Sequence, residues 1–184
     1  MTIFVALLRA VNVGGTGTLP MSDLTSLCEG LGFTGVRTYI QSGNVVFGCT
    51  WTEARAKAAL EAALAGRMQK PVDVLVRSAT EMTTVLNRNP FPSIPGNKVS
   101  VLFFDGPPKK AAFAAIKVPG REEMRLIGRE LYVHYPDGMG RSKLNLSSLS
   151  IATARNINTV AKLVAMIKQP ALTATPPASG CRPR

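Results

Sequence analysis

A glycine-rich loop followed by two cations and a hydroxyl group contains the residue types best suited to chemistry in this chain. It covers residues 135–144, and a second polar segment, residues 153–159, follows closely. Glycine lets backbone N–H groups converge on one point, and Arg141 and Lys143 add positive charge beside them. Such a loop can bind an anion. It does not by itself specify a reaction.

The segment after this loop has the periodicity of a helix from about Ala154 to Lys168. On a helical wheel one face is polar and the other apolar, and the polar face carries Arg155, Asn158, Thr159 and Lys162. A helix N-terminus carries about half a positive charge, which would add to that of the preceding loop. The ordinary alternative is that this polar face is only a solvated surface.

The charge of the chain favours an anionic partner. Its 22 Lys and Arg residues face 11 Asp and Glu residues, a formal net charge of +11. No acidic residue occurs after Asp137, whereas cations continue to the end of the sequence. A field of one sign attracts a nucleotide, a nucleic acid or a phosphorylated small molecule. The alternative is that the positive charge serves only solubility.

Three further candidates for ligand binding lie in the first quarter of the chain. Gly14 and Gly15 lie in a loop that could bring backbone amides to a phosphate, although it matches neither G-x-G-x-x-G nor the P-loop. Arg9 ends an apolar strand, so it either pairs with a carboxylate or points into a polar cleft. Gln41, Ser42 and Asn44 could bind a ligand, but residues 41–44 also form a strong hairpin signal.

Several kinds of catalytic site have no support in the sequence. His134 is the single histidine, and the three cysteines have unrelated spacings, so neither a zinc site nor a disulfide framework is predicted. No G-x-S-x-G motif is present. We therefore expect no cofactor and no metal, and the question of enzymatic activity stays open.

The order of predicted elements indicates an α+β fold made of two ferredoxin-like, or split βαβ, halves. Each half reads strand, helix, strand, strand, helix, and the first adds a closing strand. The predicted division is an N-terminal half (1–88), a Pro-rich connector (89–98), a C-terminal half (99–169) and a disordered tail (170–184). Thr50 to Glu53 and Ser78 to Glu81 have capping-box spacing, and Glu53 and Lys57 are expected to pair at i, i+4.

The expected setting is the cytoplasm. The apolar opening segment, residues 3–8, has no basic start and no cleavage site, and no apolar run reaches the roughly 18 residues of a membrane helix. We expect a monomer or a homodimer.

Five segments of the chain resemble the domain-of-unknown-function 1697 family. They are residues 8–15, 37–47, 89–91, 138–144 and 153–160. The resemblance implies a small cytoplasmic, mostly bacterial α+β protein without an established cofactor or catalytic residue. This chain has Ala10 and Val11 where the family generally has Gly and Ile, and Ile157 where the family has Trp.

Three functions are consistent with the sequence. The first is a module that binds phosphate-bearing ligands, above all nucleic acid, through the basic C-terminal loop and helix. The second is an enzyme acting on a small phosphorylated or carboxylated metabolite between the halves, with His134 moving a proton. The third is a structural or partner-binding protein. The predicted ligand-binding residues are Arg9, Asn12, Gly14, Gly15, Gln41, Ser42, Asn44, Gly140, Arg141, Ser142, Lys143, Arg155, Asn156 and Thr159.

Overall fold

The computed structural model of the protein describes residues 1–12, 18–149 and 152–169. Gly14, Gly15 and the predicted tail at 170–184 lie outside this part. No helix within it is long and apolar enough to cross a membrane.

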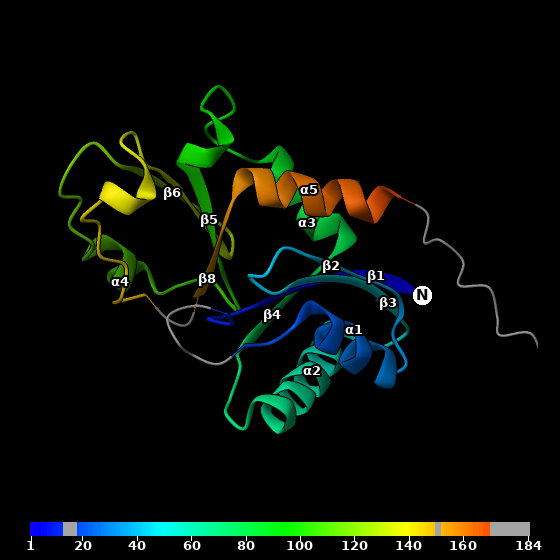
Figure 1. Cartoon of the computed structure of the whole chain (residues 1–184). Coiled ribbons are helices and arrows are strands. Elements are labelled where there is room, and N and C mark those ends of the chain that lie inside the picture. Colours follow the sequence, from blue (N-terminus) through cyan, green and yellow to red (C-terminus); the bar gives the residue numbers. More distant parts are fainter. Residues whose placement is uncertain (13–17, 150–151, 170–184) are drawn as a thin grey trace, which may run out of the picture.

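The N-terminal half is a four-stranded antiparallel sheet with the strand order β2-β3-β1-β4 (Figure 1). Helix α1 connects β1 to β2, α2 connects β3 to β4, and α3 follows β4 directly. The bounds are β1 Thr2–Leu8, α1 Met21–Gly30, β2 Thr34–Tyr39, β3 Asn44–Cys49, α2 Glu53–Met68, β4 Val74–Ser78 and α3 Ala79–Asn87.

The C-terminal half repeats this plan with the order β6-β7-β5-β8. Its bounds are the 3-10 helix η1 Gly96–Lys98, β5 Val99–Phe104, α4 Lys110–Ala114, β6 Glu123–Ile127, β7 Glu130–His134, the 3-10 helix η2 Met139–Arg141, β8 Ala152–Asn156 and α5 Ile157–Lys168. The long helix α5 follows the last strand instead of preceding it. The predicted α+β fold with two ferredoxin-like halves is confirmed, whereas the residue limits of the two halves stay a prediction.

The helix predicted from about Ala154 is wrong at its start, because residues 152–156 form the edge strand β8. Thr153 and Arg155 are buried while Ala154 and Asn156 are exposed, which is the two-residue alternation of a strand. The helix begins at Ile157, with Asn156 as its N-cap. Arg155 therefore does not belong to the polar face of the helix.

Other local predictions meet mixed outcomes. Ser78 and Glu81 form the reciprocal capping box at the start of α3. At α2, however, the N-cap is Thr52, whose side chain accepts a hydrogen bond from the Arg55 backbone, and not Thr50. The predicted Glu53–Lys57 pair is also wrong, because each side chain has a partner in a more distant part of the fold.

The alternation of apolar residues along β1 builds a core on both faces of the N-terminal sheet. Phe4, Ala6 and Leu8 pack against α1 and α2. Val5 and Leu7 face the other way, into a cluster that also contains residues of α3, α5 and β5. Figure 1 shows α1 and α2 on one side of this sheet and α3 and α5 on the other. The two halves thus share one apolar cluster.

Gly43 lies in the turn between β2 and β3 with φ +73°, and a Cβ at this position would lie 2.5 Å from Val11 Cγ2 and 2.8 Å from Leu8 Cβ. We expect Gly43→Ala to lower the free energy of unfolding by about 2 kcal/mol, because both the backbone conformation and the space require glycine. Urea denaturation measures the change. Gly30→Ala is the control, because that helical position has no atom within 4 Å; equal effects of the two substitutions would contradict the prediction.

Candidate functional site

The end of β1 and the turn between β2 and β3 meet at one corner of the N-terminal sheet. The antiparallel register places Leu7 opposite Asn44, and the Leu8 N–H donates to the Gly43 carbonyl at 2.8 Å. Just beyond β1, Asn12 Nδ2 donates to the Gln41 carbonyl at 2.8 Å. The structure thus brings together two groups of predicted residues that lie 29 positions apart in the chain. We call this region the corner.

Arg155 joins the C-terminal half to the corner. Its guanidinium Nη2 donates to the carbonyls of Leu8 at 2.8 Å and Ser42 at 2.9 Å, and Nε donates to Asn44 Oδ1. Nη1 donates to Thr153 Oγ1 and to the Ala154 carbonyl, each at 2.8 Å. The residue is only 8% exposed. All its nitrogen atoms are therefore engaged inside the protein.

The positive charge of Arg155 has no carboxylate partner among the described residues, because its acceptors are carbonyl, amide and hydroxyl oxygens. Burial lowers the pKa of its guanidinium to about 10. The group remains charged at neutral pH, since carbonyl oxygens solvate it in place of water.

The backbone at the corner is strained. In the described part of the chain four non-glycine residues have a positive φ, and three of them, Ala10 (51°), Asn12 (57°) and Ile40 (49°), lie here. Left-handed conformations of this kind cost on the order of 1 kcal/mol or more and concentrate at functional sites. Ile40 is also 48% exposed. The corner is therefore one candidate site.

Several predicted residues at the corner hold the structure instead of facing solvent. Asn44 is fully buried, and its Nδ2 donates to the Tyr39 carbonyl at 2.9 Å and to Ser42 Oγ at 3.1 Å. Arg9 is exposed and pairs with Asp73 at 3.0 Å. Of the two predicted roles for Arg9, pairing with a carboxylate is therefore the one that the structure shows. Ile40 and Gln41 remain exposed to solvent.

The glycine-rich loop forms η2 and the segment after it. The Ser142 hydroxyl donates to Glu122 Oε1 and accepts from the Leu144 N–H at 3.0 Å. Gly140, Arg141 and Lys143 are exposed, and neither cation forms an ion pair with any residue that the structure describes. Arg141 and Lys143 are thus available to a ligand, whereas Ser142 already has partners.

The start of α5 is also engaged internally. Asn156 Oδ1 accepts from the Thr159 N–H at 2.8 Å, and Thr159 itself is buried. All donors of Arg155 are also used inside the protein, so Arg155, Asn156 and Thr159 stabilise the fold around β8 and the start of α5. Arg155 was predicted to share one ligand-binding face with Arg141 and Lys143. Its side chain instead points from β8 into the N-terminal half.

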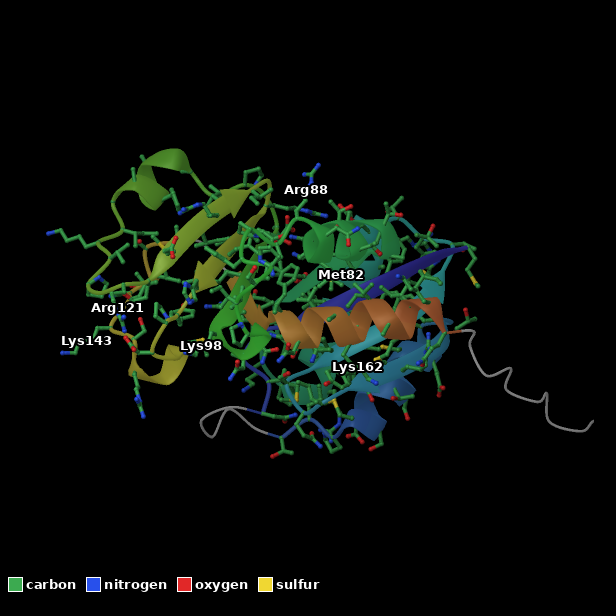
Figure 2. The ribbon with its side chains drawn as sticks, turned by 90° about the horizontal axis from the view of Figure 1, so that it is seen from above. Met82, Arg88, Lys98, Arg121, Lys143 and Lys162 are labelled. Carbon is green, nitrogen blue, oxygen red and sulfur yellow. The ribbon has the colours of Figure 1, made fainter. Side chains whose placement is uncertain are left out.

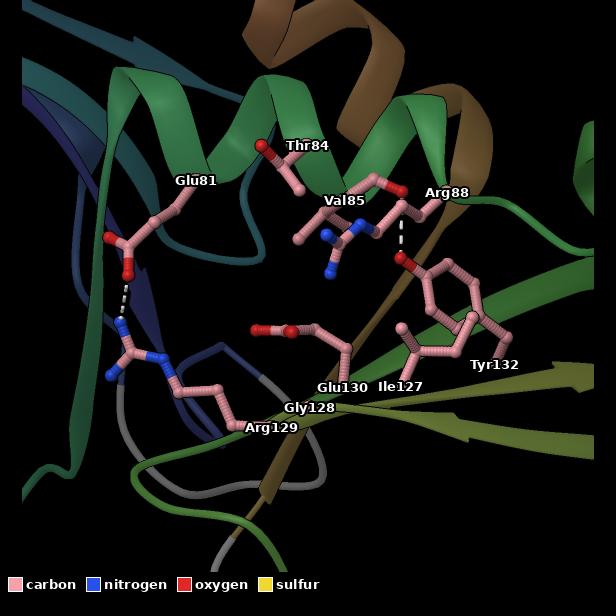
Figure 3. A pocket seen from close by; sticks show the side chains of 9 residues that line it. All are labelled: Glu81, Thr84, Val85, Arg88, Ile127, Gly128, Arg129, Glu130 and Tyr132. Atoms are coloured by element: carbon pink, nitrogen blue, oxygen red, sulfur yellow. Dashed lines mark hydrogen bonds and ion pairs between the residues drawn. The ribbon is translucent and has the colours of Figure 1, made fainter.

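A pocket of about 210 Å³ lies between α3 and the β6–β7 hairpin, one element from each half (Figure 3). Arg129 donates to Glu81 Oε1 at 2.7 Å and to both oxygens of Glu53. Arg77, 1% exposed, donates to Glu130 Oε1 at 2.8 Å. Burial lowers the pKa of Arg77, and the nearby charge of Glu130 opposes this effect.

The sequence did not point to this pocket, because its residues come from two short segments, 81–88 and 127–132, with no motif between them. The one usable signal was the Ser78–Glu81 capping box. His134 does not line the pocket; its ring packs 5.6 Å from that of Phe91, and its Nδ1 lies 3.6 Å from Glu123 Oε1.

The fold and the corner define a two-lobed α+β protein built from two ferredoxin-like sheets. Residues 1–132 match the family described as "Protein of unknown function (DUF1697)", and the chain belongs to this family, as its sequence segments predicted. No match to a curated protein was found.

Among solved structures, the chain is similar to the conserved bacterial protein SP0830 from Streptococcus pneumoniae. The TM-score is 0.74 at 22% sequence identity, and the similarity covers 91% of this chain and 99% of that one. At this identity the comparison shows a shared fold.

Arg155→Met should lower the free energy of unfolding by about 3 kcal/mol or more, because several buried carbonyl oxygens would lose their donor. Chemical denaturation of the two proteins measures the loss. Arg141→Met, which removes an exposed cation without an ion pair to a described residue, is the matched control and should change stability by less than about 0.5 kcal/mol. An Arg155→Met variant as stable as this control would contradict the structural role.

The pocket wall predicts a dependence of stability on pH. Burial would raise the pKa of Glu81, but hydrogen bonds from Ser78 and the charge of Arg129 outweigh it, so the pKa lies below its ordinary value. A lowered folded-state pKa stabilises the protein above the unfolded-state pKa, and this contribution is lost as the pH falls through the folded-state value.

Glu81→Gln should therefore destabilise the protein at pH 7, and the difference from wild type should shrink as the pH falls below about 4. Urea denaturation across this range tests it. Glu29→Gln is the control, because Glu29 is exposed and forms no ion pair with a described residue. Its difference in stability from wild type should not change over this pH range. A constant difference for Glu81→Gln would contradict the ionic role of this carboxylate.

Proposed function

We propose that the protein binds an extended polyanion, and that the sugar–phosphate backbone of nucleic acid is the natural partner of this kind. The observation that carries the proposal is the distribution of ion pairs. Of the 11 acidic residues, all in the described part, nine form ion pairs with Lys or Arg, and only Glu29 and Glu122 do not. The excess charge therefore lies on cations without a carboxylate partner.

The distribution of these cations favours a long ligand over a small one. Figure 2 labels Lys98, Lys143 and Lys162, which are spread along the length of the molecule and not gathered around one cavity. Arg141 and Lys143 are exposed, and Lys98 uses its ammonium group only to reach the Pro136 carbonyl at 2.8 Å. A polymer with regularly spaced phosphates can contact several separated cations, whereas a single phosphate group cannot.

The predicted binding residues have two roles in this proposal. Arg141 and Lys143 would contact phosphates. A second point of contact at the corner would be formed by the exposed Gln41, the half-buried Ser42 and Arg9, which also keeps its ion pair with Asp73. Asn12, Asn44, Arg155, Asn156 and Thr159 would act by holding the backbone around them. Aromatic residues make up only 6% of the chain, so base stacking and sequence readout are not expected.

Fluorescence anisotropy with labelled DNA and RNA duplexes of unrelated sequences tests the proposal. With about four phosphate contacts we expect binding at low salt that weakens roughly 100-fold between about 50 and 200 mM salt, since each contact releases about 0.9 counterion. The double variant Arg141→Gln/Lys143→Gln should weaken binding and reduce the salt slope by about two.

The matched control is Lys70→Gln/Lys117→Gln, which removes the same charge from cations outside the η2 loop. It should leave most of the affinity in place. Absence of binding at low salt would refute the proposal, and equal losses in the two double variants would refute the assignment to the η2 loop.

A further inference from the structure

The pocket between α3 and the β6–β7 hairpin differs electrostatically from the rest of this basic molecule. Six charged side chains line or support it: Arg77, Arg88, Arg129, Glu53, Glu81 and Glu130. Three are positive and three are negative, so the pocket is neutral on a chain of net charge +11. An anion such as phosphate therefore gains no net attraction from the pocket, unlike at the exposed lysines.

Most of these charges are already paired and held in place. Arg129 is fixed by Glu53 and Glu81, whose other oxygen Oε2 accepts from the Ser78 N–H and hydroxyl, each at 2.8 Å. Arg77 donates to one oxygen of Glu130, to the Phe104 carbonyl at 2.6 Å and to the Val76 carbonyl at 2.8 Å. The walls of the pocket are thus preorganised.

Two charged groups at the pocket keep unused capacity. Glu130 Oε2 makes no hydrogen bond with a described residue, although the side chain is only 12% exposed. The Arg88 guanidinium forms no hydrogen bond or ion pair within residues 1–12, 18–149 and 152–169. Figure 3 shows the Glu130 carboxylate and the Arg88 side chain facing the same space under α3, and they do not form an ion pair with each other.

The remaining lining is apolar or neutral. Tyr132 donates its hydroxyl to the Val85 carbonyl at 2.7 Å, and burial raises the pKa of this phenol, so it stays neutral and can still accept a hydrogen bond. Ile127 and Val85 supply an apolar side. The volume of about 210 Å³ is below the roughly 300 Å³ at which pockets for drug-sized ligands begin.

We propose that this pocket binds a small zwitterion of the amino-acid class. Its ammonium group would donate to Glu130 Oε2, its carboxylate would accept from the Arg88 guanidinium, and a short side chain would lie against Ile127. One carboxylate acceptor and one guanidinium donor facing a common space in a neutral pocket match a ligand with both charges better than one with a single charge.

Isothermal titration calorimetry with L-alanine, L-leucine and L-glutamine as probes tests the ligand class. We expect at least one to bind with a Kd of about 1 mM or below. N-acetyl-L-alanine, which lacks the ammonium group, and L-alaninamide, which lacks the carboxylate, should each bind at least about tenfold more weakly than L-alanine, because each loses one charge-assisted hydrogen bond. No binding of any probe, or equal binding of the blocked derivatives, would overturn the proposal.

The position of the site is tested with Arg88→Gln, an exposed residue whose replacement breaks no ion pair between described residues. It should weaken binding of the probe at least about tenfold while the urea denaturation midpoint is unchanged. Arg141→Gln removes the same charge from the η2 loop and should leave probe binding intact. The amide NMR signals of Gly128 and Glu130 should shift on titration of the wild-type protein. Unchanged affinity in Arg88→Gln, or shifts confined to other regions, would overturn the assignment.

Discussion

The buried guanidinium of Arg155 is the interaction on which the arrangement of the two halves depends. A cation removed from water requires other dipoles to solvate it, and here they are main-chain carbonyls of the β1 end and the β2–β3 turn. Those carbonyls point at Arg155 only when the turn has its observed shape. The C-terminal half therefore fixes the conformation of a turn in the N-terminal half, and Gly43, with its positive φ, makes that shape accessible.

A second polar junction also connects the two halves. Arg77 of β4 reaches Glu130 of β7, and Arg129 of the same hairpin reaches Glu53 and Glu81. In the shared apolar cluster, Val5 and Leu7 meet residues of β5 and α5. Apolar burial supplies the main attraction between the halves, whereas the two arginine networks restrict the halves to one relative orientation.

The sequence predicted the fold well where the signals were local. The Ser78–Glu81 capping box, the turn at Gly43 and the repeated element order are features of neighbouring residues. It failed at β8, because residues 152–156 are rich in alanine and only their partner β5 makes them a strand. It also missed the Glu53–Arg129 pair, since helical spacing favoured Lys57 and the true partner is 76 positions away.

The candidate sites show the same limit. The residue types at Arg9, Asn12 and Gln41 predicted ligand binding from the sequence alone. Their proximity depends on the antiparallel register of β1 and β3, which places the residues after β1 beside the β2–β3 turn. Arg155 was recognised as important for its charge, but its acceptors are backbone carbonyls, which no residue type signals. The pocket beneath α3 could not be predicted, because it exists only where the two halves meet.

Helix α5 begins at the residue after β8 and packs against α3 and β3 of the first half. The last described helix therefore covers apolar residues of the first strands. During synthesis, α3 can cover part of the face that carries Val5 and Leu7, but the cover supplied by α5 is missing until residues 157–168 leave the ribosome. Until then a nascent chain of this protein exposes part of an apolar face, and this is the type of surface that chaperones bind.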